Sequence, residues 1–197
     1  MNRNNPYETG LDRNPANYVP LSPLSFLART AEVHPDRVAV IHGEHQTTWS
    51  EVYRRCRKLA SAPTQRGIGA GDTVAVMAPN IPMMFEAHFG VPMTGAVLNT
   101  LNTRLDAEAL AFMLNHGGAK ALLSDREFSA TIAVALRQVE REVLVIDIDD
   151  ALAGGGDLIG EMDYEAFLDT GDADFAFHSS CGNLHAKSTS PVARKAS

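Results

Sequence analysis

Residues 73–124 decide the fold, and they read TVAVMAPNIPMMFEAHFGVPMTGAVLNTLNTRLDAEALAFMLNHGGAKALLS. Three largely apolar runs, at 73–78, 96–101 and 119–124, are separated by two segments with helical spacing of apolar residues. The first run, TVAVMA, is apolar at nearly every position, which is typical of a strand buried on both faces of a sheet. Strands that alternate with helices in this way form right-handed crossovers. The stretch therefore predicts an α/β fold with a mostly parallel sheet and flanking helices.

The same pattern sets the expected boundaries in this half of the chain. Asn80 is a candidate N-cap for a helix over 81–93, and Asp106 is one for a helix that ends before Gly117. Further along, we expect a helix over 126–139, a strand over 142–148 and a short helix over 164–168.

Smaller elements are predicted before the sheet. A helix begins at Ser25 and stops at Pro35, and residues 38–49 form a small hairpin. Ser50 then caps an amphipathic helix that should end or kink near Ala62, because Pro63 lacks a backbone donor. The cations of this helix should face water; they are Arg54, Arg55, Arg57 and Lys58.

Composition divides the chain into three parts. Residues 1–24 hold four prolines and five asparagines, which predict an extended arm. Residues 25–177 hold the alternating elements. Residues 178–197 lack apolar periodicity and change from acidic to basic, so we expect a disordered tail.

The charge balance limits the partners of the chain. Lys and Arg number 17 against 24 Asp and Glu, a formal net charge of −7. Nucleic acids and anionic membrane surfaces carry the same sign and are therefore not expected as partners. No stretch approaches the roughly 18 apolar residues of a membrane span. Two cysteines 125 positions apart suggest neither a disulfide framework nor a metal motif, and the N-terminus has no apolar signal core, so a cytoplasmic location is expected.

Several motifs invite a catalytic interpretation that their context does not support. Gly67, Gly69 and Gly71 precede a strand, whereas a phosphate loop follows one, so we interpret them as a helix end and a loop. His42 and His45 have only Glu44 nearby, too few ligands for zinc, and are expected to be solvated turn residues. No GxSxG motif is present, and Cys56 lies on the apolar face of its helix, where it should be a core residue. His88 should pack or bond to a neighbour. No catalytic and no metal-binding residue is predicted.

Arg104 is the one candidate binding residue. It lies in LNTRL between a strand and a helix, where an arginine can reach an anion beyond the carboxyl end of the sheet. The alternative is a surface arginine that pairs with Asp106 or Glu108.

Four blocks together resemble the N-terminal part of the AMP-forming acyl-CoA synthetases, members of the adenylate-forming superfamily. They are HPDRVAV at 34–40, TTWSEVYRRCRKLAS at 47–61, residues 66–105 and LNHGGAKALLSD at 114–125. The lead-in ANYVPLSPLSFL and FGVPMTGAVLNTLNTRL are most similar to the subgroup acting on medium-chain, branched or aryl acids. The resemblance implies that residues 25–177 are a partial AMP-binding domain.

The resemblance also implies a reaction. A carboxylic acid, ATP and magnesium give an acyl-adenylate, and coenzyme A then takes the acyl group. Arg104 matches a family position near the nucleotide part of coenzyme A. The family carries a glycine-rich phosphate loop of the type YTSGTTGxPKG, whereas the equivalent stretch here is KSTSPVARKAS, without glycine. Also missing are the acyl pocket, the ribose-binding aspartate and the domain with the catalytic lysine.

Three hypotheses follow. The first is a truncated ligase fragment that is inactive alone. The second is an assembly module that pairs with a separately encoded remainder, and the third is a fragment of another adenylate-forming enzyme, such as a peptide-synthetase or luciferase-like domain.

Overall fold

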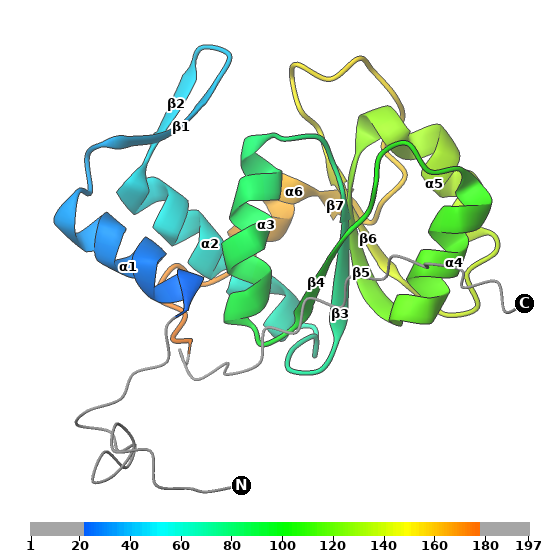
Figure 1. The fold of residues 1–197 in the computed structure, drawn as a ribbon, viewed down its shortest axis with the longest axis horizontal. Helices are drawn as coiled ribbons and strands as arrows, with labels where there is room; N and C mark the ends of the chain where they lie inside the picture. The colour runs from blue at the N-terminus through cyan, green and yellow to red at the C-terminus, as the bar shows by residue number, and fades with distance from the viewer. Residues whose placement is uncertain (1–21, 178–197) are drawn as a thin grey trace, which may run out of the picture.

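The computed structural model describes residues 22–177, so the predictions for the arm before residue 22 and for the tail 178–197 lie outside the described residues. Five parallel strands form the central sheet in the order β4-β3-β5-β6-β7 (Figure 1). The strands are β3 (Thr73–Met77), β4 (Val97–Thr100), β5 (Ala119–Asp125), β6 (Leu144–Ile148) and β7 (Met162–Asp163). The predicted α/β class with a parallel sheet is confirmed.

Helices cover both faces of this sheet (Figure 1). One face carries α2 (Trp49–Thr64), α3 (Pro82–Met93) and α6 (Tyr164–Asp169), and the other carries α4 (Ala107–Gly117) and α5 (Ser129–Leu136). Strand β3 serves both layers because its side chains alternate: Val74 and Val76 belong to the first core, Ala75 and Met77 to the second. This explains the continuous apolar run that marks β3 in the sequence.

A third apolar cluster attaches the N-terminal elements. Helix α1 (Pro23–Val33) and the antiparallel hairpin of β1 (Val38–His42) and β2 (His45–Thr48) pack against α2 and α3. The predicted hairpin is present, and Gly43 in its turn has a φ of +59°. Helix α1 begins two residues earlier than predicted because Pro23 occupies its first turn and Ser22 caps it.

The predicted N-caps are right for one helix and wrong for two. Asp106 caps α4 by accepting the Ala109 amide at 2.9 Å, as expected. Thr48, not Ser50, caps α2, with the Glu51 amide 3.3 Å from its Oγ1. At α3 the N-cap is Ile81 rather than Asn80, and no side chain caps it. Pro82 starts that helix and removes one of the amides that a cap would serve.

Pro63 shortens α2 less than expected. The helix ends at Thr64, two residues beyond the predicted end. Proline costs the helix one bond to a carbonyl four residues earlier, and here only the last turn is affected. The Thr64 hydroxyl donates to the Ala60 carbonyl at 2.8 Å, and the Ile68 amide donates to the Pro63 carbonyl at 3.0 Å. The loop therefore satisfies carbonyl groups at this end of the helix.

Near the C-terminal end of the sheet, two details differ from the prediction. The segment 126–139 divides into a 3₁₀ turn, η1 (Arg126–Phe128), and α5, which ends at Leu136. Asp125 begins this turn by accepting the Glu127 amide. Strand β7 was not predicted, because two residues carry no periodicity. The expected short helix is present as α6.

The expectation that the cations of α2 face water is wrong for three of the four. Arg55 pairs with Glu86 and Glu165, both at 2.6 Å, and Lys58 pairs with Asp169 at 2.9 Å. Arg57 lies 3.5 Å from Asp174 and donates to the Phe175 carbonyl at 3.1 Å. Arg54 pairs within its own helix and stays 45% exposed. These acidic partners lie 31 residues away along the chain for Glu86 and more than 100 for the others, so local periodicity could not reveal them.

Candidate functional site

The order of the strands places the candidate ligand edge at the carboxyl ends of β3 and β5. The chain runs from β3 to β4 on one side and then to β5 on the other, which makes the β3–β5 boundary the switch point of the sheet. In open α/β sheets, ligands bind outside the carboxyl ends of the strands at such a point. The residues that leave the sheet there are Ala78 after β3 and Asp125 at the end of β5.

Asp125 is the most unusual group at this edge. Its side chain is fully buried: Oδ1 accepts the Glu127 amide at 2.9 Å, and Oδ2 has no hydrogen-bond partner among residues 22–177. Burial raises the pKa of this carboxyl, the Glu127 amide opposes the shift and the charge of Asp150 adds to it. Sequence analysis missed Asp125, although an aspartate directly after a buried strand is a recognisable signal.

Asp150 and His42 lie beyond the neighbouring strand β6. The Nε2 atom of His42 is 2.9 and 3.0 Å from the two carboxylate oxygens of Asp150, which also accepts the Leu152 amide at 3.2 Å. The prediction that His42 is a solvated turn residue is therefore wrong, because the contact between His42 and Asp150 joins the hairpin to the loop after β6. His45, in contrast, is exposed.

Arg104 lies where the sequence placed it, in the loop after the carboxyl end of β4, and it is exposed. Its amide donates to Asn102 Oδ1 at 3.0 Å. Within residues 22–177 its guanidinium forms no ion pair, so the alternative of pairing with Asp106 or Glu108 is not seen. Asp106 is instead occupied as the N-cap of α4. Among the described residues, the Arg104 guanidinium thus has no ion-pair partner that an external anion would displace.

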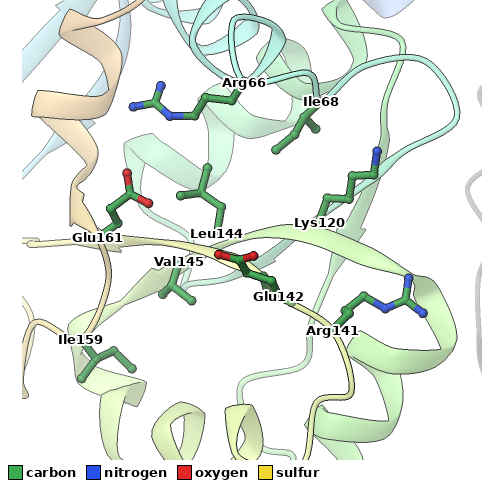
Figure 2. Close-up of a pocket in the computed structure, with 10 residues that line it drawn as sticks. Arg66, Ile68, Lys120, Arg141, Glu142, Leu144, Val145, Ile159 and Glu161 are labelled. Atoms are coloured by element: carbon green, nitrogen blue, oxygen red, sulfur yellow. The ribbon is translucent and has the colours of Figure 1, made fainter.

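At the amino ends of the strands, opposite the carboxyl ends described above, the sheet holds a cavity of about 640 Å³ (Figure 2). It lies at the amino ends of β5, β6 and β7, and its apolar lining includes Leu144 and Ile159, which pack on opposite faces of the sheet. The lining residues are Arg66, Ile68, Lys120, Arg141, Glu142, Val143, Leu144, Val145, Ile159 and Glu161. Arg104 and Asp125 do not line it. The structure therefore does not bring the predicted binding residue into the cavity.

Two of the three cations that line this cavity have structural explanations. Arg66 lies just after the C-terminus of α2, where a positive charge stabilises the helix dipole, and Lys120 pairs with Asp72 at 2.7 Å. Its lining contains no histidine, cysteine or serine that could act as a nucleophile or general base at neutral pH. The cavity offers charge and apolar surface but no catalytic group of these kinds.

The other motifs follow their structural interpretations. The Gly69 amide donates to Asp72 Oδ2 at 2.9 Å, so an aspartate of the glycine-rich loop itself closes the loop. This agrees with its interpretation as a helix end followed by a loop. Cys56 is fully buried with its Sγ 3.6 Å from the Glu86 carbonyl, and His88 Nδ1 is 2.7 Å from the Met84 carbonyl, which confirms both predictions. In the described part of the chain, no group of three potential metal ligands comes together.

Comparisons with known proteins agree with this architecture. Residues 27–176 match the family of AMP-binding enzymes. The chain is 47% identical over 177 residues to the peroxisomal acetate/butyrate–CoA ligase of Arabidopsis thaliana, covering 84% of this chain and 31% of that protein. It is 40% identical to the 2-methylpropanoate–CoA ligase of Humulus lupulus over 168 residues, covering 82% of this chain and 30% of that protein.

A solved structure shows the same fold. An anthranilate–CoA ligase in complex with anthranoyl-AMP superposes with a TM-score of 0.72 at 16% identity, covering 82% of this chain and 30% of that chain. The chain thus spans about a third of the length of the relatives it matches. Among residues 22–177, no helix is both long and apolar enough to cross a membrane. With the family match extending over most of its length, the chain belongs to the family of AMP-binding enzymes.

Proposed function

We propose that this chain is the N-terminal structural part of an acyl-CoA ligase, which joins a carboxylic acid to coenzyme A through an acyl-adenylate at the expense of ATP. The observation that carries the proposal is the sequence match to acyl-CoA ligases over more than 80% of the chain. Magnesium, ATP and coenzyme A would be the cofactors of the whole enzyme. The other adenylate-forming classes are less well supported, since these relatives are named as CoA ligases.

The chain supplies a scaffold in this proposal and leaves the chemistry to the rest of the ligase. Neither the switch-point edge nor the cavity at the opposite edge provides a phosphate loop. At the carboxyl edge, Arg104 is exposed and can meet a ligand, whereas the Asp125 carboxyl is fully buried. Arg104 is proposed as a contact to the nucleotide part of coenzyme A, because its guanidinium is exposed and forms no ion pair in the described region.

The acid is proposed to be a short, branched or aryl carboxylic acid. The names of the relatives include acetate, butyrate, benzoate and 2-methylpropanoate as substrates. These names extend the medium-chain, branched or aryl range that the sequence suggests towards shorter acids.

Location is a separate part of the proposal. Cytoplasmic placement rests on two cysteines 125 positions apart in the sequence. Several relatives are named as peroxisomal, and fluorescence of the tagged chain in cells would distinguish the two compartments.

Exchange of labelled pyrophosphate into ATP tests the proposed division of labour. The purified 197-residue chain should give no exchange above background with acetate, butyrate or benzoate, with magnesium present. Robust exchange that depends on one of these acids would show that the chain carries the adenylation chemistry itself, and would contradict the proposal.

A further inference from the structure

Residues 149–157, which follow β6, form a strap that rests on the first turns after β5. Arg126 in η1 donates from Nε to the Gly156 carbonyl at 3.1 Å. The Asp157 amide donates to the Ser129 hydroxyl of α5 at 3.0 Å. A Cβ at Gly156 would overlap the Arg126 carbonyl, so the backbone of the strap lies directly against η1.

The first half of the strap is held by charged groups and not by apolar packing. Asp149 pairs with Arg126, and both carboxylate oxygens of Asp150 lie within 3.0 Å of His42 Nε2 in the hairpin. Asp150 is the only buried residue of the strap, and Leu152 is 63% exposed. A segment that is held by polar contacts and buries no apolar side chain can open locally at low free energy.

Asp125 lies directly before the turn on which the strap rests, and it is fully buried. Its Oδ2 has no hydrogen-bond partner among residues 22–177. The charged groups that act on its carboxyl are Asp150 of the strap, and Glu127 and Arg126 of η1. Burial raises the pKa of this carboxyl, the Glu127 amide opposes the shift and the charge of Asp150 adds to it. Ionised, Asp125 would be a buried charge with one oxygen unpartnered and another carboxylate nearby, which is costly.

We propose that the strap is a pH-dependent cover, which stays closed while Asp125 holds its proton and opens when Asp125 ionises. Opening lets water reach the Asp125 carboxylate and separates it from Asp150, so the cost of the buried charge is removed. It also uncovers the carboxyl ends of β5 and β6, the edge of the sheet at which ligands of such folds bind. The inference concerns this segment alone and does not depend on the proposed function.

The direction of the pH dependence follows from the two states of the strap. In the open strap Asp125 is solvated and has the pKa of an ordinary aspartate, about 3.9, whereas in the closed strap its pKa is higher. Between these two values opening releases one proton, so the equilibrium constant for opening rises about tenfold per pH unit. The stability of the closed strap that Asp125 supplies is therefore complete below the lower pKa and is lost as the pH rises through the higher one.

Hydrogen exchange of single amides, measured by NMR on the 197-residue chain between pH 4 and 8, tests this cover. The Asp157 amide reports on the strap, and the Leu101 amide, which donates to the Val76 carbonyl, reports on the sheet. Each rate is compared with that of an unprotected amide at the same pH, because exchange is itself base-catalysed. We expect the protection of the Asp157 amide to fall with rising pH by up to about tenfold per unit, while that of Leu101 stays constant.

Two variants locate the group that titrates. Asp125→Asn keeps the shape of the side chain and an oxygen for the Glu127 amide but cannot ionise, so the pH dependence should disappear. Glu127→Gln is the matched control, because it removes an exposed carboxylate two residues away and should leave the pH dependence in place. Carbon-13 NMR of the Asp125 carboxyl follows its ionisation in the wild type, so the test does not require Asp125→Asn to fold. Its midpoint should mark the pH at which the fall in protection ends.

Three results would overturn the proposal. Protection of the Asp157 amide that is constant over this pH range would show that the strap does not respond to ionisation. A fall that persists in Asp125→Asn, or that ends away from the Asp125 midpoint, would assign the response to another group such as His42, since histidines change charge between pH 5 and 8. An equal fall for Leu101 would show that the whole sheet opens and that the strap is not a separate cover.

Discussion

Glu86 is a carboxylate buried at the junction of three helices, and it shows how single residues hold this fold together. Its side chain is 3% exposed and lies 2.6 Å from Arg55 of α2, and the Tyr164 hydroxyl of α6 donates to it at 2.9 Å. Arg55 also pairs with Glu165. A buried charge is tolerated only with such partners, so each bond in this cluster should contribute to stability.

Tyr164→Phe should lower the free energy of unfolding by about 1.5–3 kcal/mol, the range for hydrogen bonds to charged groups. The ring remains and still packs in the core, so the hydroxyl alone is tested. Tyr53→Phe is the matched control, because the Tyr53 hydroxyl has no hydrogen bond within residues 22–177 and its loss should change stability by less than about 0.5 kcal/mol. Urea unfolding measures both. Equal effects of the two substitutions would show that the Tyr164–Glu86 bond contributes nothing.

Glu86 also predicts the sign of a pH dependence. Burial raises the pKa of its carboxyl above 4.5, while the bonds from Arg55 and Tyr164 oppose the shift. A group whose pKa is higher in the folded state gives stability that is present below its unfolded pKa and is lost as the pH rises through the folded one. Wild-type protein should therefore gain stability relative to Glu86→Gln as the pH falls from 7 towards 4.5.

Glu51 provides the opposite case for the same titration. Its hydrogen bond with Arg54 lowers its pKa below 4.5, so its contribution is present above that pH and is lost as the pH falls through the lowered value. The difference between wild type and Glu51→Gln should shrink on acidification. Urea unfolding at several pH values measures the free energy of unfolding of wild type and both variants. If the stability of wild type relative to Glu86→Gln also fell on acidification, the assignment would be contradicted.

For single residues, the sequence predicts burial and position in an element better than it predicts which distant residue each one contacts. Cys56 and His88 could be placed correctly because helical periodicity fixes which face they lie on. The His42–Asp150 contact could not, since 108 residues separate the pair and nothing local marks the acid as its partner. The same holds for Arg55, whose role depends on residues of α3 and α6.

Between elements, helices α2 and α3 pack closely against each other at Gly90 and Leu59. A Cβ added to Gly90 would lie 2.7–2.8 Å from three side-chain atoms of Leu59. Leu59 is itself buried, so neither helix can give way without disturbing the core. A glycine inside α3, costly to the helix, is explained by this contact.

Gly90→Ala should destabilise the protein by about 1–3 kcal/mol, the range for overpacking, even though alanine favours helix formation. Gly154→Ala is the control, because a Cβ there meets nothing within 4 Å and its φ is not positive. Thermal unfolding followed by circular dichroism measures both. A Gly90→Ala protein as stable as wild type would show that the two helices are separated more widely than described.

Elements were predictable where the sequence repeats a pattern and unpredictable where it does not. The strands β3 and β5 and the helix α4 follow from apolar runs, Asp106 and the glycine at 118, which takes the left-handed conformation at the helix end. Strand β7 is too short to show a period. The N-cap of α2 was misplaced by two residues because Thr48 and Ser50 are chemically equivalent candidates.

The whole molecule separates its charged cavity from its candidate ligand edge. The cavity lies at the amino ends of the strands (Figure 2). Arg104 and Asp125 lie at or beyond the carboxyl ends. The parallel sheet could be predicted from the alternation of strands and helices along the sequence. The position of the cavity could not, because it depends on loops that carry no motif. The function came from blocks of sequence that resemble one family, since no described residue cluster performs catalysis alone.

The most direct test of this division of labour is formation of butyryl-CoA, measured by mass spectrometry after incubation with butyrate, ATP, magnesium and coenzyme A. The 197-residue chain alone should form none above background, whereas the complete acetate/butyrate ligase of Arabidopsis thaliana, assayed in parallel as the positive control, should form it. Butyryl-CoA formed by the chain alone would contradict the account.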